Sequence, residues 1–411
     1  MSQEISTIRQ LLQQKVFAHS SIQRFNPYSI AVFQKLKNCH TAAIGVHQFR
    51  CNNSNCLHTH RQYHSCGNRH CMNCGTLKKE QWIHDRMSEL LPTTYFHVVF
   101  TLPQELRSLC MGNRTLLFNL LFEASHHTIT TLAANERWLG AQPGIVSILH
   151  TNGQDLSFHP HIHCIVTGGG INKYGKWIAE KRANGMFLFP RRLLENTFKA
   201  YFIKRLAVYF KQDLLRIEDE NTFHESMLAI HQKDWNVYAK APFGGPAQIV
   251  EYLGRYTHKV AITAHRISEI SDTNITFSYK DYADGNAVKS MTLGHEEFLR
   301  RFEQHILPRH FVKIRHAGFL THRNKHARIA SILQQLNLPR AMPKIKLSAE
   351  LFCLINTGKD LSKCPICKTG KLERIATYVN INGRLINILE LNNRGSPKPQ
   401  MKLKHETHKN K

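Results

Sequence analysis

The stretch from Cys39 to Cys74 constrains the fold of this chain more than any other feature. It holds six of the eleven cysteines, at positions 39, 51, 56, 66, 71 and 74. The stretch is polar, rich in histidine and turn residues, and too poor in apolar residues to fold without a cross-link. Because the first thirty residues carry no signal-peptide pattern, this crowding favours metal binding over a disulfide framework.

The cysteine spacing is typical of structural zinc. Four residues lie within the first pair, two within the second, and fourteen separate the pairs. Short pairs of this kind wrap a tetrahedral Zn²⁺ ion. The expected ligands are Cys51, Cys56, Cys71 and Cys74.

Other side chains compete for the same ion or for a second one. The first pair is wider than usual, so one of its members could be replaced by His58, His60 or His64. Cys66 and His70 are additional candidate ligands, while we expect Cys39 to be a buried thiol. Arg69 lies beside this module and is a candidate DNA contact.

The net positive charge of the chain indicates the kind of molecule that it binds. The 411 residues include 55 Lys and Arg against 29 Asp and Glu, a net charge of +26, in a chain that is 42% apolar. Such a composition supports ordinary cores, and the commonest partner for the excess positive charge is nucleic acid. No apolar run of about 20 residues is present, so we expect a cytoplasmic protein without a membrane partner.

Periodicity predicts an α+β protein whose central domain holds an antiparallel sheet and flanking helices. The expected divisions are a helical lead-in at 1–38, a zinc module at 39–90, a catalytic domain at 91–340, a cysteine-containing segment at 341–391 and a basic disordered tail at 392–411. Expected helices follow Lys78 and cover 106–134, much of 190–235 and 247–258. Expected strands are 95–102, 144–149, 161–167, 260–267, 275–279 and 287–293.

The most informative motif is His159-Pro160-His161-Ile162-His163. On a strand, His161 and His163 point to the same face and can bind one cation. A hairpin turning near residue 156 would bring His150 opposite them as a third ligand, with Gln154 as the alternative. Such a set leaves open positions on the cation for substrate oxygens.

Two tyrosines occupy one expected helix. Tyr252 and Tyr256 are one helical turn apart, at the border between an apolar stripe and a polar face that carries Arg255 and Lys259. The pair could be ordinary edge aromatics packed on a sheet. Combined with the histidines, however, it fits phosphodiester chemistry, in which a cation polarises the scissile phosphate while a tyrosine attacks it.

At these residues the chain resembles the two-tyrosine rolling-circle transposases of bacterial insertion sequences, which are HUH endonucleases. The matching stretches are 63–74, 95–103, 149–151 with 159–163, 252–257 and 314–320. The resemblance implies a palm-like antiparallel sheet, His161 and His163 as ligands of Mg²⁺ or Mn²⁺, and Tyr252 and Tyr256 as nucleophiles.

The same resemblance implies the reaction and the partners. Cleavage of single-stranded DNA at the element's ends would leave a 5′-phosphotyrosine and a free 3′-OH, and joining to target DNA would follow. The zinc module would bind DNA, and the protein would associate with the bacterial nucleoid. The oligomeric state is not indicated.

Alternatives remain open at this point. A plasmid replication initiator or relaxase would use the same chemistry, and a zinc-dependent nucleic-acid-binding regulator would use the charge and cysteines without cleavage. A second knuckle, Cys364-Pro365-Ile366-Cys367, lies near the carboxyl end with Cys353 upstream. Two ligands cannot fill a tetrahedral site, so Cys353 and a nearby residue would have to complete it, or the pair holds no metal.

Overall fold

The computed structural model describes residues 8–13, 24–181, 188–240, 247–248, 250–251, 254, 261–341 and 343–389. The chain divides into two compact units, one of residues 1–37 and 67–348 and the other of residues 38–66 and 349–411. This differs from the linear order of domains expected from sequence. The expected module at 39–90 is divided after residue 66, and its first part joins the carboxyl-terminal segment.

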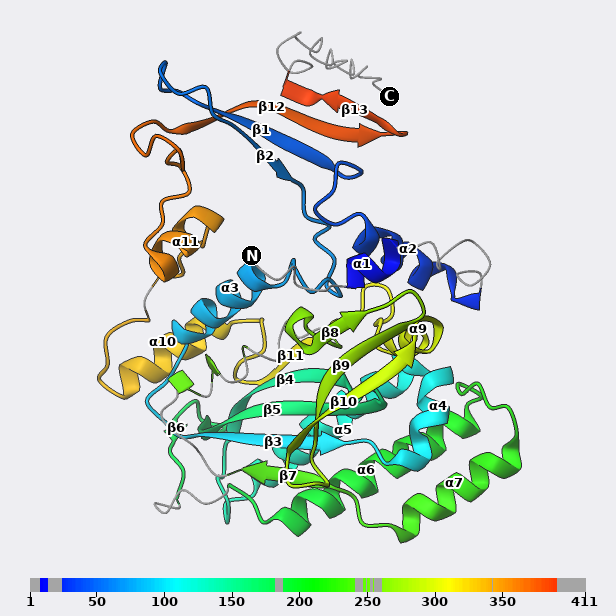
Figure 1. Cartoon of the computed structure of the whole chain (residues 1–411). Coiled ribbons are helices and arrows are strands. Elements are labelled where there is room, and N and C mark those ends of the chain that lie inside the picture. Colours follow the sequence, from blue (N-terminus) through cyan, green and yellow to red (C-terminus); the bar gives the residue numbers. More distant parts are fainter. Residues whose placement is uncertain are drawn as a thin grey trace, which may run out of the picture. The chain divides into compact units, whose positions relative to one another are not determined.

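A twisted antiparallel sheet forms the centre of the first unit (Figure 1). Its strand order is β11-β4-β5-β3-β7, and the short strand β6 pairs antiparallel with the end of β5. The strands are β3 (Tyr95–Thr101), β4 (Gln142–Asn152), β5 (Phe158–Ile171), β6 (Trp177–Ile178), β7 (Val237–Lys240) and β11 (Ile314–Gly318). The expected α+β class with an antiparallel sheet is therefore confirmed, as are the strand at 95–102 and the hairpin of β4 and β5.

Helices cover one face of this sheet. They are α4 (Arg107–Gly112), α5 (Arg114–Ala134) and α6 (Arg191–Lys211), preceded by the 3₁₀ turn η3 (Gln104–Leu106), with α7 (Glu220–Gln232) packed beside them. Alternate strand residues such as Phe100, Leu149 and Ile162 enter the large apolar core on this side. Strand alternation then directs the intervening residues to the opposite face.

The opposite face carries a smaller apolar cluster and the histidines. Tyr95, Val146, Ile148 and Ile165 are buried there. Trp82 of α3 (Thr76–Met87) packs against them. The expected helix at 247–258 is described only at Ala247, Gln248, Val250, Glu251 and Gly254, all helical.

The remaining elements of the first unit surround the sheet. A three-stranded antiparallel sheet consists of β8 (Ile267–Ile270), β9 (Asn274–Asp281) and β10 (Ala287–Gly294), followed by α9 (His295–Gln304). The strand expected at 260–267 is wrong at residues 261–266, where η4 (Ala264–Arg266) stands, and the strand β8 begins only at Ile267. The other helices are α1 (Ile8–Gln13), α2 (Pro27–Lys37) and α10 (Lys325–Gln335).

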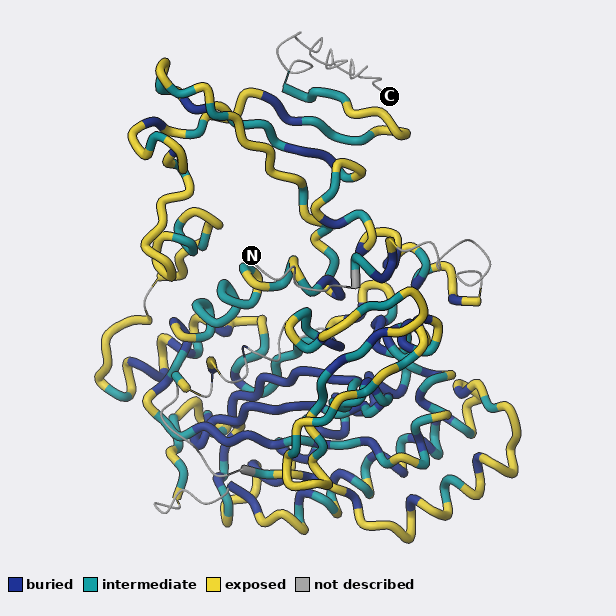
Figure 2. The backbone as a smooth tube through the Cα atoms, in the orientation of Figure 1, coloured by how far each residue is buried: buried dark blue, intermediate teal, exposed yellow. Residues whose placement is uncertain are grey.

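The second unit joins two distant parts of the chain in one sheet. Its strand order is β13-β12-β1-β2, with β1 (Gly45–Cys51) pairing antiparallel to β12 (Leu372–Ile381). The outer strands are β2 (Thr59–Tyr63) and β13 (Arg384–Asn387), and the helix is α11 (Ala349–Thr357). Strand β2 is exposed along its whole length (Figure 2).

Two further expectations concern the ends and the membrane. The tail at 392–411 lies outside the described residues. Among the described helices, none combines the length and apolarity needed to cross a membrane.

Candidate functional site

Three imidazoles meet on the open face of the central sheet. His150 of β4 pairs directly with His161 of β5, and His163 lies two residues further along the same face. Their ligand nitrogens all lie within 4.8 Å of one another, and the ring centroids of His150 and His163 are 4.6 Å apart. His150 and His163 are buried, whereas His161 is half-buried, so the group is open on one side.

Hydrogen bonds orient two of these rings. Nδ1 of His161 lies 2.6 Å from the carbonyl oxygen of His159, so this nitrogen carries the proton and Nε2 has the lone pair. Nδ1 of His163 lies 2.8 Å from Nε2 of His97 on β3, and both side chains are buried. The distal nitrogens are thus the ones suited to a cation, as in most protein sites built from histidine.

The set of donors fits a divalent cation. Three nitrogen ligands from rigid neighbouring strands leave coordination positions for oxygens of water or substrate. His159, the first histidine of the motif, is engaged elsewhere, because the Arg107 guanidinium donates to its Nδ1 at 2.6 Å. Burial and the charge of Arg107 lower the pKa of His159, so this ring is neutral.

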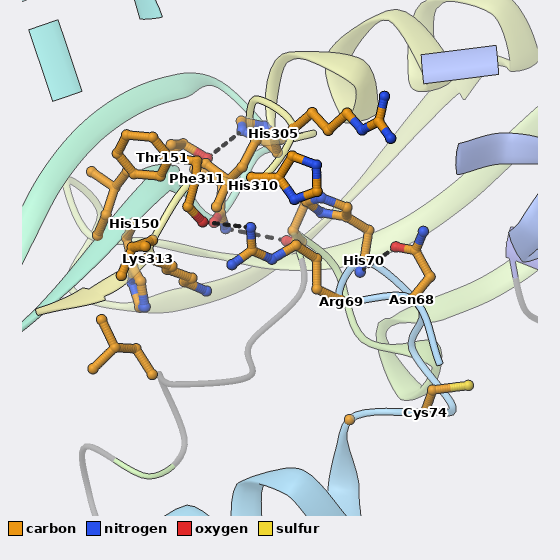
Figure 3. A pocket seen from close by; sticks show the side chains of 18 of the residues that line it. Asn68, Arg69, His70, Cys74, His150, Thr151, His305, His310, Phe311 and Lys313 are labelled. Atoms are coloured by element: carbon orange, nitrogen blue, oxygen red, sulfur yellow. Dashed lines mark hydrogen bonds between the residues drawn. The ribbon is translucent and has the colours of Figure 1, made fainter. Parts of the chain in front are cut away.

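A large basic cavity adjoins His150 (Figure 3). It has a volume of about 800 Å³ and is lined by residues of α2, of the loop before α3 and the start of α3, of β4 and of the segment between α9 and β11. The cations that line it are Lys35, Arg69, Lys78, Arg309 and Lys313. No Asp or Glu is among its described lining residues. The cavity therefore favours a polyanion.

Buried neutral imidazoles form part of the cavity wall. Burial, together with the charges of Arg69 and Lys313, lowers the pKa of His70 to about 3. Burial lowers the pKa of His305 to about 4, and its ring bonds Oγ1 of Thr151 and the carbonyl of Leu156, each at 3.1 Å. The His305 ring thus holds the chain that follows His150 in place, and neither ring adds charge at neutral pH.

Three other residues singled out from the sequence lie outside the groups in which they were expected, and two of them line the cavity. The side-chain amide of Gln154 donates to the Tyr282 hydroxyl at 3.1 Å, and Gln154 is not part of the histidine group. Arg69 is exposed at the cavity and donates to the Phe311 carbonyl at 2.7 Å. His70 lines the same cavity, and its backbone amide donates to the Asn68 side-chain oxygen. It was a candidate zinc ligand, but it does not lie in a group with cysteines.

The expected nucleophiles Tyr252 and Tyr256, and the expected DNA contacts Arg255 and Lys259, lie outside the described residues. Their neighbour Val250 is buried and lines a small pocket with Tyr95, Val146 and Ile165. These three residues lie on the histidine-bearing face, where Val146 and Ile165 form a cross-strand pair.

The cysteines group differently from the arrangement expected from spacing. Cys51 and Cys56 lie with Cys364 and Cys367 in the second unit, where the four sulfur atoms are within 4.8 Å of one another. Cys71 and Cys74, which the spacing paired with Cys51 and Cys56, belong to the first unit, and Cys66 belongs to the second. Cys353, the expected partner of the second knuckle, instead contacts Thr357 within α11.

Two features of the site were not expected from the sequence. His97 lies in an apolar strand pattern, and only the pairing of β3 with β5 brings it to His163. Lys313 and Arg309 lie in a loop that shows no local signal of its own. The strand that follows this loop, β11, pairs with β4, and this pairing brings the loop to the cavity.

Comparison with known proteins identifies two family domains in the chain. Residues 8–102 match the model described as "Transposase zinc-binding domain", and residues 144–328 match the model described as "Putative transposase". No solved structure matches the chain.

Two curated relatives match over most of their length. "Putative transposase y4qJ" of Sinorhizobium fredii is 38% identical over 86% of this chain and 90% of the relative. "Transposase for insertion sequence element IS801" of Pseudomonas savastanoi pv. phaseolicola is 29% identical over 87% of this chain and 85% of the relative. With its zinc-binding and transposase domains in this order, the chain belongs to the IS91 family of insertion-sequence transposases.

Proposed function

We propose that this transposase cleaves and rejoins single-stranded DNA at the ends of its insertion element through a 5′-phosphotyrosine intermediate. The phenolic oxygen of Tyr252 or Tyr256 attacks the scissile phosphorus, forming an O–P bond and breaking the bond to the 3′ oxygen. The phenol loses its proton to solvent, and the departing 3′ oxygen gains one. Rejoining reverses these steps with a new 3′-OH.

The observation that carries this proposal is the group of His150, His161 and His163. Three imidazoles converging on one open sheet face have little structural purpose, since a close-packed apolar face would be more stable. Nδ1 of His161 is fixed by a backbone carbonyl, which is the usual arrangement for a metal-binding histidine.

We assign these three residues to a divalent cation, Mn²⁺ or Mg²⁺. When bound, the ion supplies Lewis-acid polarisation of the scissile phosphate. The protein's part is to hold the nitrogens in place on two paired strands. Because Mg²⁺ prefers oxygen ligands and imidazole suits softer ions, we expect Mn²⁺ to bind more tightly.

The basic cavity supports the proposal that a DNA strand binds beside these three histidines. Its lysines and arginines can neutralise phosphates, and it opens next to His150. Burial of Val250 on the histidine-bearing face supports the tyrosines as nucleophiles, because Val250 precedes Tyr252 by only two residues.

The test uses labelled single-stranded oligonucleotides from both element ends, incubated with the protein and Mn²⁺, Mg²⁺ or EDTA. We expect a protein-linked DNA band only with metal and single strands, and no band from His161→Ala. The control Tyr174→Phe, at an exposed turn, should behave like the wild type. Cleavage by the Tyr252→Phe, Tyr256→Phe double variant would refute the nucleophile assignment.

The competing functions give different results in the same assay. A regulator that only binds nucleic acid would shift the oligonucleotides without forming an adduct. A replication initiator or relaxase would form an adduct on an origin sequence and leave the element ends intact.

A further inference from the structure

The second unit has almost no apolar core of its own. Among its described residues, the buried apolar side chains are Cys39, Val46, Cys51, Cys364 and Ala376. Three of these five are cysteines. A four-stranded sheet with so little apolar burial needs another source of stability, and small units of this kind commonly use a metal ion.

Four sulfur atoms of this unit are arranged as the corners of one site. Sγ of Cys51 lies 3.6 Å from Sγ of Cys367, and Sγ of Cys56 lies 3.8 Å from Sγ of Cys364. All four are within 4.8 Å of one another. A tetrahedron of thiolates at about 2.3 Å from zinc has edges of about 3.8 Å, which these separations approach.

The backbone around the sulfurs is folded into two tight turns. In the first, the Cys56 amide donates to the Asn53 carbonyl at 2.9 Å. In the second, the Lys368 amide donates to the Cys364 carbonyl at 3.0 Å, and the Gly370 amide donates to Sγ of Cys367 at 3.3 Å. An amide donating to sulfur stabilises a thiolate, which is the form that binds zinc.

Direct contacts hold the two turns together. The Asn52 amide donates to the Lys371 carbonyl at 2.9 Å, and the Lys371 amide donates back to the Asn52 side chain at 2.8 Å. Gly370 is packed so closely that a Cβ atom there would lie 2.4 Å from Sγ of Cys51. Since these contacts join residues more than 300 positions apart, the approach of the sulfurs is built into the fold.

We propose that Cys51, Cys56, Cys364 and Cys367 together bind one structural zinc ion that joins the amino-terminal and carboxyl-terminal segments into one module. Two of these ligands lie beyond residues 8–102, the part of the chain that matches the zinc-binding domain. The ion replaces the missing apolar core between β1 and β12. The alternative of two disulfides is disfavoured because each sulfur has three close neighbours instead of one.

The test measures zinc per chain in the full-length protein by elemental analysis and native mass spectrometry. We expect Cys364→Ser with Cys367→Ser to lose one equivalent, and Cys51→Ser with Cys56→Ser to lose the same equivalent. The quadruple variant should lose no more than either pair. Cys353→Ser, a cysteine of the same unit outside the group, should retain the wild-type content.

A rescue variant separates lost ligation from failed folding. Cys367→His keeps a zinc-binding side chain, so it should retain the ion that Cys367→Ser loses. Removal of zinc by a chelator should make residues 349–389 sensitive to protease while residues 95–181, which contain the central sheet, stay resistant. The proposal is overturned if the quadruple variant loses two equivalents of zinc, or if either double variant keeps the wild-type zinc content. It is also overturned if the mass of the wild-type chain is lower by the four hydrogen atoms that two disulfides would remove.

Discussion

His97 is the residue whose replacement tests the metal assignment most directly. Its Nε2 lies 2.8 Å from Nδ1 of His163, and the two rings are nearly parallel, at 4°. If Nε2 of His163 binds the cation, then Nδ1 carries the ring proton and donates it to His97. His97→Leu removes this acceptor while keeping similar volume.

The expected cost has two parts. Leaving the N–H group of His163 buried without its acceptor costs about 1–3 kcal/mol of folding stability. Loss of a hydrogen-bond partner behind a metal-binding histidine weakens metal affinity roughly 10–100-fold, or about 1.4–2.7 kcal/mol. His97→Gln, whose amide oxygen can accept the same hydrogen bond, should recover part of the folding stability and part of the metal affinity.

Mn²⁺ titration by calorimetry measures the affinity, and urea unfolding without metal measures the stability. His126→Leu is the matched control, because Nε2 of His126 bonds Oγ of Ser147 at 2.8 Å on the helix-covered face of the same sheet. It should lose stability but keep Mn²⁺ affinity. The reasoning is refuted if His97→Leu binds Mn²⁺ within threefold of the wild type, or if His126→Leu weakens binding equally.

Three other outcomes follow from particular residues. Lys313→Ala removes a cation from the basic cavity, so the slope of log binding constant against log salt concentration for single-stranded DNA should become shallower by about 0.7, measured by fluorescence anisotropy. Lys211→Ala, on α6, should leave this slope unchanged. Burial lowers the pKa of His305 to about 4, so the folded state resists protonation that the unfolded state accepts. The contribution of His305 to stability should therefore fall as the pH drops from about 6.5 towards 4, by up to roughly 3 kcal/mol. Urea unfolding of His305→Gln should show a pH dependence that is weaker by this amount, whereas His265→Gln, at an exposed position, should match the wild type. Gly318 has φ +62°, and a Cβ there would lie 1.7 Å from the Pro143 carbonyl oxygen. Gly318→Ala should therefore destabilise the folded protein more than Gly175→Ala, because Gly175 also has a positive φ but a Cβ there would meet no atom within 4 Å. Thermal unfolding of the two variants measures the difference.

The hairpin that carries the histidines could be predicted because its signals are local. The apolar runs of β4 and β5, the polar turn between them and the spacing of His161 and His163 all lie within about thirty residues. Register then follows from which residues must be buried, and it brings His150 opposite His161. The grouping of the three histidines is thus encoded by a short-range sequence pattern.

The cysteine grouping could not be predicted in this way. Spacing suggested Cys71 and Cys74 as partners of Cys51 and Cys56, but β1 pairs with β12 from the other end of the chain. Strand β1 reads Gly45-Val46-His47-Gln48-Phe49-Arg50-Cys51, with only its ends buried, so its periodicity is weak. Pairing over such sequence distance is decided by the folded structure as a whole, which a local pattern does not contain.

The two halves of the proposed chemistry depend on different parts of the first unit. The proposed metal ligands are fixed by backbone pairing of β4 and β5, whereas the described residues of the tyrosine stretch contact their surroundings through side-chain packing. Val250 enters the pocket beside Val146 and Ile165, and a Cβ on Gly254 would lie 2.3 Å from Cγ1 of Ile83 on α3. Substitutions at these contacts should therefore displace the nucleophiles without changing the metal group. Gly254→Val should reduce adduct formation while Mn²⁺ affinity stays at the wild-type level, and a parallel loss of both would mean that the tyrosine stretch helps to hold the ion.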